Sequence, residues 1–140
     1  MKKRPIREYM TKDPCSIGVE QTLTQAHELM RARRIRHLPV LAAGKLVGVI
    51  SQRDLSLIEA LSDVDPATVP VDDAMSEPYT VTADESLAAV ATVMADKKYG
   101  SAVVMADDRL VGLFTTTDAL RALSELLRAE RTPKRPRRAA

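Results

Sequence analysis

Aromatic residues and cysteine are scarce in this chain: it has no tryptophan, one phenylalanine, three tyrosines and one cysteine among 140 residues. The core must therefore be built mainly from aliphatic side chains and methionine. Cys15 alone cannot form an internal disulfide, and His27 and His37 have no neighbouring ligand cluster that would indicate structural zinc. No apolar run approaches the roughly 18 residues of a membrane span, and the first ten residues lack the apolar stretch of a secretory signal. These absences predict a cytoplasmic protein.

The charge of the chain is small overall but unevenly distributed. The formal net charge is +2, yet residues 1–10 and 131–140 together contribute +8 and the 120 residues between them −6. A folded domain of negative sign is a poor match for nucleic acid, whose binding depends on cations that neutralise phosphates. We predict that residues 128–140 form a basic, disordered tail, and a tail that acts as an arm for nucleic acid or an acidic partner is the alternative.

The sequence repeats itself at an offset of 64 residues. GVISQRDL (48–55) returns as GLFTTTDA (112–119), and nine positions from residue 14 to residue 54 are identical to their counterparts. Ordinary composition would give roughly three such matches by chance. A fixed offset of this kind indicates a duplicated structural unit.

Each copy has the same predicted order of elements. A short extended piece (15–19; 79–82) precedes an amphipathic helix, a two-stranded hairpin (37–41 with 45–51; 101–106 with 109–115) and a closing amphipathic helix. The sequence thus predicts a mixed α+β fold of two β-α-β-β-α repeats, 6–61 and 74–127, joined by a linker, 62–73. Because repeats this small bury little surface alone, we expect them to pack together with pseudo-two-fold symmetry.

The repeated signature is a glycine, two apolar residues, a hydroxyl residue and, three positions later, an aspartate. Ser51 with Asp54, and Thr115 with Asp118, could form capping boxes that only satisfy the start of the closing helix. A carboxylate at a helix start can also accept hydrogen bonds from a sugar diol, while the hydroxyl reaches a phosphate. Glycine weakens an apolar strand unless something approaches its backbone closely, which favours the second interpretation.

A ring attached to such a sugar needs an apolar wall. The candidates are Ile17, Leu38 and Pro39 in the first copy and Val81, Ala102 and Val103 in the second. Pro39 has no N–H, which predicts a strand start or an edge strand and leaves a neighbouring backbone group open to a ligand.

Taken together, the motifs MTKDPCSI, RHLPV and GKLVGVISQRDL resemble the cystathionine β-synthase (CBS) domain, and the tandem arrangement resembles a CBS pair, or Bateman module. The resemblance covers residues 6 to about 127. It implies two clefts between the repeats, dimerisation, and adenosine-containing ligands: AMP, ADP, ATP or S-adenosylmethionine. By position it implies that Asp54 and Asp118 hold the ribose and that Ser51 and Thr115 lie near ribose or phosphate. The phosphate candidates are Arg36, His37 and Arg53.

The second copy departs from this pattern. Gly100 and Ser101 replace Arg36 and His37, Val103 replaces Pro39, and Thr117 replaces Arg53. We therefore expect two unequal sites, with weaker phosphate binding in the second cleft unless basic residues of the first repeat reach across.

The resulting functional prediction is a regulatory module that binds an adenosine ligand and signals to a partner. No nucleophile with a nearby base, phosphate-cradling glycine loop or metal-ligand set indicates an enzyme. Two alternatives are a structural dimerisation module with degenerate clefts and a nucleic-acid-associated protein that uses its basic tail.

Overall fold

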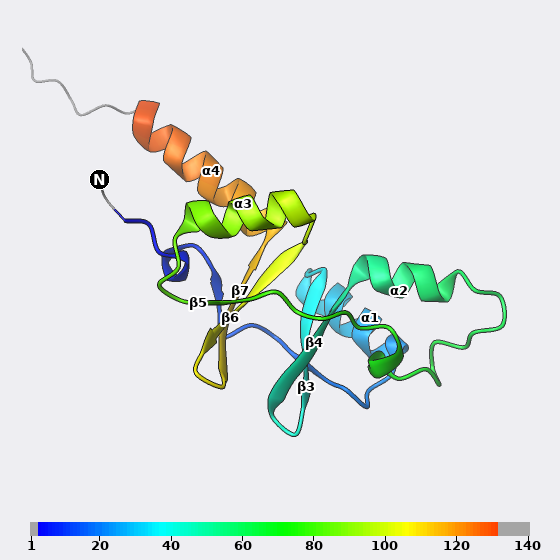
Figure 1. Ribbon diagram of the computed structural model, residues 1–140. Coiled ribbons are helices and arrows are strands. Elements are labelled where there is room, and N and C mark those ends of the chain that lie inside the picture. Colours follow the sequence, from blue (N-terminus) through cyan, green and yellow to red (C-terminus); the bar gives the residue numbers. More distant parts are fainter. Residues whose placement is uncertain (1–2, 132–140) are drawn as a thin grey trace, which may run out of the picture.

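The computed structural model describes residues 3–131. Each repeat has the predicted β-α-β-β-α order, which confirms the mixed α+β fold (Figure 1). The helices are α1 (Leu23–Arg33), α2 (Gln52–Glu59), α3 (Leu87–Lys97) and α4 (Thr116–Arg131). The strands are β1 (Thr11–Lys12), β2 (Ile17–Gly18), β3 (His37–Ala42), β4 (Lys45–Ser51), β5 (Thr80–Thr82), β6 (Ser101–Ala106) and β7 (Arg109–Thr115), with 3-10 turns at Ile6–Glu8 and Val71–Asp73.

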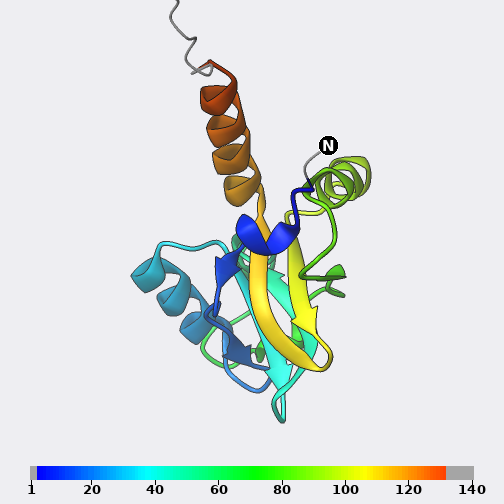
Figure 2. The same ribbon diagram turned by 90° about the vertical axis from the view of Figure 1, so that its left-hand side faces the viewer.

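The strands form two sheets that lie at the centre of the molecule with helices outside them (Figures 1 and 2). One sheet has the order β2-β3-β4 and the other β1-β7-β6-β5. In each, a parallel pair is followed by an antiparallel hairpin, and the hairpin register shifts at equivalent places, Val40/Leu41 and Val104/Met105. The matching irregularity shows that the duplication extends to backbone detail.

The segment that leads into each repeat packs on the other repeat. Ile6 is fully buried in the core built around Phe114, and Val71 is fully buried in the core built around Leu38. The backbone N–H of Ile6 donates to the Glu85 carbonyl, and that of Val71 donates to Gln21, both at 2.7 Å. β1 likewise pairs with β7 of the second repeat. This exchange holds the two halves together.

The two signature glycines make room for methionines on these exchanged segments. A Cβ on Gly48 would lie 2.5 Å from the Met75 sulfur, and a Cβ on Gly112 would collide with the Met10 sulfur. The close approach that the glycines permit is therefore made by a side chain of the opposite repeat. Their recurrence is explained by packing between repeats without any ligand.

Pro39 does not occupy the expected strand start or edge. It is the third residue of β3, the middle strand of its sheet, opposite Val49. Val49 exchanges both backbone hydrogen bonds with Ser76 instead, at 2.9 Å each. In the second repeat the equivalent Val103 donates its N–H to the Tyr79 carbonyl at 2.7 Å. Proline cannot make that bond, which fits the shorter parallel strand β2 of the first repeat.

The last helix continues beyond the predicted repeat boundary. α4 runs to Arg131, so its final four residues fall within the segment predicted to be a disordered tail. Figure 2 shows this helix projecting from the body of the molecule. The rest of the predicted tail, residues 132–140, lies outside the described residues. Among residues 3–131, no helix combines the length and apolar character needed to cross a membrane.

Candidate functional site

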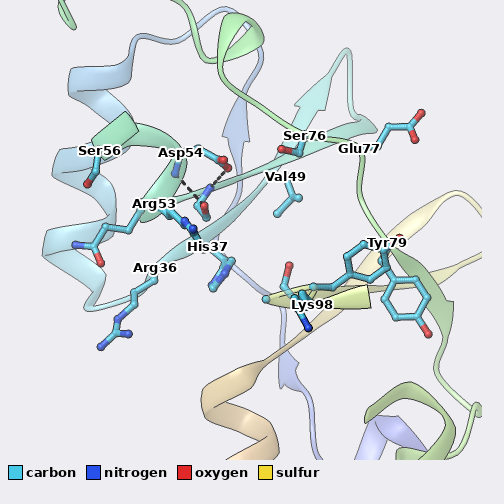
Figure 3. A pocket seen from close by; sticks show the side chains of 15 residues that line it. Arg36, His37, Val49, Arg53, Asp54, Ser56, Ser76, Glu77, Tyr79 and Lys98 are labelled. Atoms are coloured by element: carbon cyan, nitrogen blue, oxygen red, sulfur yellow. Dashed lines mark hydrogen bonds between the residues drawn. The ribbon is translucent and has the colours of Figure 1, made fainter. Parts of the chain in front are cut away.

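A cavity of about 700 Å³ opens between the two repeats beside the end of β4 (Figure 3). Its walls come from both repeats and from the segment that leads into β5. The lining residues are Arg36, His37, Val49, Ser51, Gln52, Arg53, Asp54, Ser56, Ser76, Glu77, Tyr79, Lys98, Tyr99, Gly100 and Ser101. The structure thus brings together five of the residues predicted to bind the ligand in the first cleft: Arg36, His37, Ser51, Arg53 and Asp54.

Asp54 caps its helix and still presents an oxygen to the cavity. Its Oδ2 accepts the Ser51 N–H at 2.8 Å, and the Ser51 hydroxyl accepts the Asp54 N–H at 3.1 Å (Figure 3). No hydrogen-bond donor within residues 3–131 reaches Oδ1 of Asp54. The capping interpretation is correct for this pair, and it leaves one carboxylate oxygen available. Helix capping and ligand binding are therefore compatible here.

Three basic side chains line the same cavity as this carboxylate. Arg36 and Arg53 come from the first repeat, and Lys98 comes from the second. Burial lowers the pKa of His37 below its ordinary value of 6.5, the Arg36 charge lowers it further, and the Asp54 charge opposes both. The cavity thus combines three permanent cations with a histidine held toward its neutral form, beside the acids Asp54 and Glu77.

Lys98 was missed by sequence reasoning, although the repeat offset contains a signal for it. Lys98 is the counterpart of Arg34, and each ends the first helix of its repeat in a left-handed conformation, with φ of 62° and 56°. Because the repeats face each other, a cation at this position in one repeat can reach the cleft whose acid belongs to the other.

Two tyrosines of the second repeat form an aromatic corner of the same cavity. The Tyr79 and Tyr99 ring centroids are 5.2 Å apart with an interplanar angle of 34°. Burial raises the pKa of Tyr79 above its ordinary value of 10.0, with smaller contributions from Glu85 and Tyr99. Both tyrosines were also missed. The sequence did not show that the segment that carries Tyr79 crosses to the cleft of the first repeat, or that Tyr99, just after α3, faces the same cleft.

Four of the six predicted apolar wall residues lie in the two hydrophobic cores, and Pro39 and Val103 are fully buried outside them. All are nearly or fully buried, and none lines this cavity: Ile17, Leu38, Pro39, Val81, Ala102 and Val103. Val81 does line a separate hollow of about 450 Å³ beside Lys45 and Asp108. Direct contact of these six residues with a ligand stays a prediction.

Asp118, the second predicted ribose ligand, is enclosed by the protein itself. Its side chain is bonded on both oxygens: the Thr115 N–H donates to Oδ2 at 2.9 Å, and Arg121 to Oδ1 at 3.3 Å. The Thr11 hydroxyl lies 3.2 and 3.3 Å from the two oxygens. Asp118 is 5% exposed, whereas Thr117 is exposed in the first turn of α4. Neither Thr115, Thr117 nor Asp118 lines the cavity beside Asp54.

One of the second repeat's departures from the first, Gly100 in place of arginine, has a steric reason where the two repeats meet. A Cβ on Gly100 would lie 2.7 Å from Nε2 of His37. Glycine at position 100 therefore admits the histidine of the first repeat, and both Gly100 and Ser101 line the first cavity. Within residues 3–131, no group of three or more histidine, cysteine or acidic side chains is arranged to hold a metal ion.

Solved structures with the same architecture include CBS domain pairs. AcuB from Vibrio cholerae is 30% identical with a TM-score of 0.83, over 96% of this chain and 100% of that one. The CBS domain of a bacterial CNNM/CorC family Mg²⁺ transporter, solved with ATP, is 25% identical with a TM-score of 0.75, over 86% and 87%. The CBS domain pair of protein MJ0100, solved with 5-methylthioadenosine and S-adenosylmethionine, shares the fold at 23% identity and a TM-score of 0.81, over 89% and 99%.

Curated relatives match only part of the chain. An uncharacterized 17.7 kDa protein of Acidianus ambivalens is 41% identical over 61 residues, 43% of this chain and 36% of the relative. An inosine-5'-monophosphate dehydrogenase of Korarchaeum cryptofilum is 35% identical over 51 residues, 36% of this chain and 11% of that enzyme. The CBS domain family model matches both repeats, at residues 6–60 and 62–125, and the chain therefore belongs to the CBS domain family as a tandem pair.

Proposed function

We propose that this CBS pair is a regulatory module that binds one adenosine-containing ligand in the cavity beside Asp54. The observation that carries the proposal is the Oδ1 oxygen of Asp54, without a protein donor among the described residues, in a cavity of about 700 Å³. A volume of this size is typical of small-molecule sites.

The lining residues divide into three roles. Asp54 accepts hydrogen bonds from the ribose hydroxyls, with Ser51 beside it. Arg36, His37 and Arg53 face the phosphate, where guanidinium groups form strong, charge-assisted bonds. Tyr79 and Tyr99 offer the base an aromatic surface. The module itself is regulatory and performs no chemistry on its ligand.

The comparisons support the ligand class. The transporter domain was solved with ATP, and the MJ0100 pair with S-adenosylmethionine and 5-methylthioadenosine. All three molecules contain adenosine. AMP, ADP, ATP and S-adenosylmethionine are accordingly the candidate ligands.

A thermal-shift panel of these four compounds tests the proposal. We expect an adenine nucleotide to raise the melting temperature, because a ligand at about a hundred times its Kd stabilises the folded state by about 2.7 kcal/mol. Asp54→Asn should remove most of this gain. Asp118→Asn is the matched control and should keep it, measured against its own unliganded melting temperature. Flat curves with all four compounds in the wild type would refute the proposal.

We also propose that the chain forms a homodimer through α4 and α2. Leu120, Leu123 and Leu127 are 62%, 52% and 51% exposed and follow the alternating three- and four-residue spacing of a coiled-coil seam. Leu57 on α2 and Leu61, two residues after its end, are similarly exposed. Such an exposed leucine stripe can pack against the same stripe on a second copy of the chain. Analytical ultracentrifugation of the wild type and of Leu123→Glu tests this, and a wild-type monomer at micromolar concentration would contradict it. The same stripe is what a purely structural dimerisation module would need.

A further inference from the structure

Another hollow, of about 310 Å³ and separate from the one beside Val81, adjoins the proposed nucleotide site. It lies at the end of α1, where its walls include Arg31, Arg34 and His27. Arg36 and Gln52 line both this hollow and the cavity beside Asp54. These two side chains thus lie between the two spaces, and Arg36 is one of the phosphate candidates.

This hollow at the end of α1 is strongly basic. Arg31, Arg34 and Arg36 supply three guanidinium groups, and no carboxylate lines it. Glu59 contacts His27, one of the lining residues, and accepts a hydrogen bond from its Nδ1 at 3.1 Å. No ion pair within residues 3–131 involves the three arginines. Their charges thus remain available to an anion.

Backbone hydrogen bonds fix the main-chain positions of Arg34 and Arg36. Arg34 ends α1 in a left-handed conformation, and its N–H bonds the Arg31 and Met30 carbonyls, which covers part of the helix's negative end. The Arg36 carbonyl accepts the Gln52 N–H at 2.8 Å, which ties this residue to the start of α2. The positive end of α2 therefore lies beside the basic hollow.

We infer that this hollow, defined by Arg31, Arg34 and Arg36, is a subsite for the outer phosphates of a nucleoside triphosphate. The inference rests on the proposed function, and it narrows the ligand class from any adenosine compound to one with an extended phosphate chain. An AMP phosphate ends at Arg36 and Arg53, whereas the β- and γ-phosphates of ATP continue to Arg31 and Arg34. S-adenosylmethionine places no anion there.

Isothermal titration with AMP and ATP, without divalent cations and at fixed ionic strength, tests this subsite. We expect the wild type to bind ATP at least tenfold more tightly than AMP. The double variant Arg31→Gln/Arg34→Gln should lose at least fivefold in ATP affinity and less than twofold in AMP affinity. Arg33→Gln/Arg109→Gln removes the same charge from exposed positions outside the hollow, so it should change either affinity less than twofold.

The outcomes separate the two proposals. Binding of AMP and ATP with equal affinity, or equal ATP loss in the test and control variants, overturns the subsite while the proposed function stands. Inorganic tripolyphosphate that binds as tightly as ATP would also overturn it, because the arginines would then form a general anion surface. Failure of both nucleotides to bind the wild type would refute the proposed function and the subsite together.

Discussion

Asp54 and Asp118 occupy equivalent positions in the two repeats, and their surroundings differ. Asp54 bonds its own helix start through one oxygen and presents the other to a cavity. Asp118 is held by Thr11, Thr115 and Arg121, so the protein itself occupies both of its oxygens. The same signature thus produces one open site and one closed structural anchor. The signature alone does not determine whether a cleft is available.

The residue that makes the difference belongs to the opposite repeat. Thr11 follows Met10, and Ser76 follows Met75, so the two residues are counterparts, paired with Leu113 and Val49 respectively. Thr11 pairs within β1 against β7 and contacts Asp118, whereas Ser76 makes only an isolated bridge with Val49. The first segment has one more residue before its proline, and Asp13 accommodates it with a φ of 48°. A single extra residue thus accompanies the closure of the second cleft.

The largest expected effect on stability comes from disturbing the glycine–methionine packing that occurs in both repeats. Gly112→Ala and Gly48→Ala should each lower the free energy of unfolding by about 3 kcal/mol, because the new methyl overlaps Met10 or Met75. Urea unfolding measures the loss. Adding Met10→Ala to Gly112→Ala should restore part of the stability, and a denaturation midpoint unchanged by either glycine substitution would contradict this account of the signature.

The second-largest expected effect is the difference between the stability losses caused by replacing the two aspartates. Asp118→Ala leaves buried donors without a partner and should cost about 2 kcal/mol, whereas Asp54→Ala removes mainly a helix cap and should cost about 1 kcal/mol. Thermal and urea unfolding without ligand give both values. A larger loss for Asp54 would reverse the comparison between open and closed clefts.

Removing the hydroxyl that closes the second cleft should have a smaller effect. Thr11→Val keeps the shape but loses the hydrogen bond to Asp118, so it should reduce stability by about 1 kcal/mol. Ser76→Ala is the matched substitution beside Asp54 and should change stability by less than half as much. Equal losses in urea unfolding would show that Thr11 has no special role.

The smallest expected effect is on the pH dependence of ligand binding. The pKa of His37 lies below 6.5 in the folded protein, so stability without ligand decreases as the pH falls through that value. A bound phosphate favours the protonated imidazole, and binding therefore takes up a proton. ATP affinity should rise about threefold more in the wild type than in His37→Gln between pH 7.5 and 6.0. Identical profiles by isothermal titration would exclude His37 from the phosphate site.

The repeat offset was enough to predict the architecture. Hydrophobic periodicity and turn residues predicted the order of elements in each half, because local patterns determine helices and hairpins. The sequence could not show that Ile6 and Val71 cross to the opposite cores, since an exchanged segment has the same local pattern as one that folds back. For the same reason it missed Tyr79 in the cavity and attributed Gly48 to a ligand. Asp54 was predictable because its role depends on its own strand and helix.

The exchanged leading segments also constrain how the chain can be made. Ile6 is synthesised more than a hundred residues before Phe114 and Ala122, which belong to the core that buries it. During translation the segment around Ile6 must therefore stay uncovered until the second repeat has left the ribosome. Each half is consequently incomplete when expressed alone, and two separately produced halves could regain their missing edges only by meeting each other.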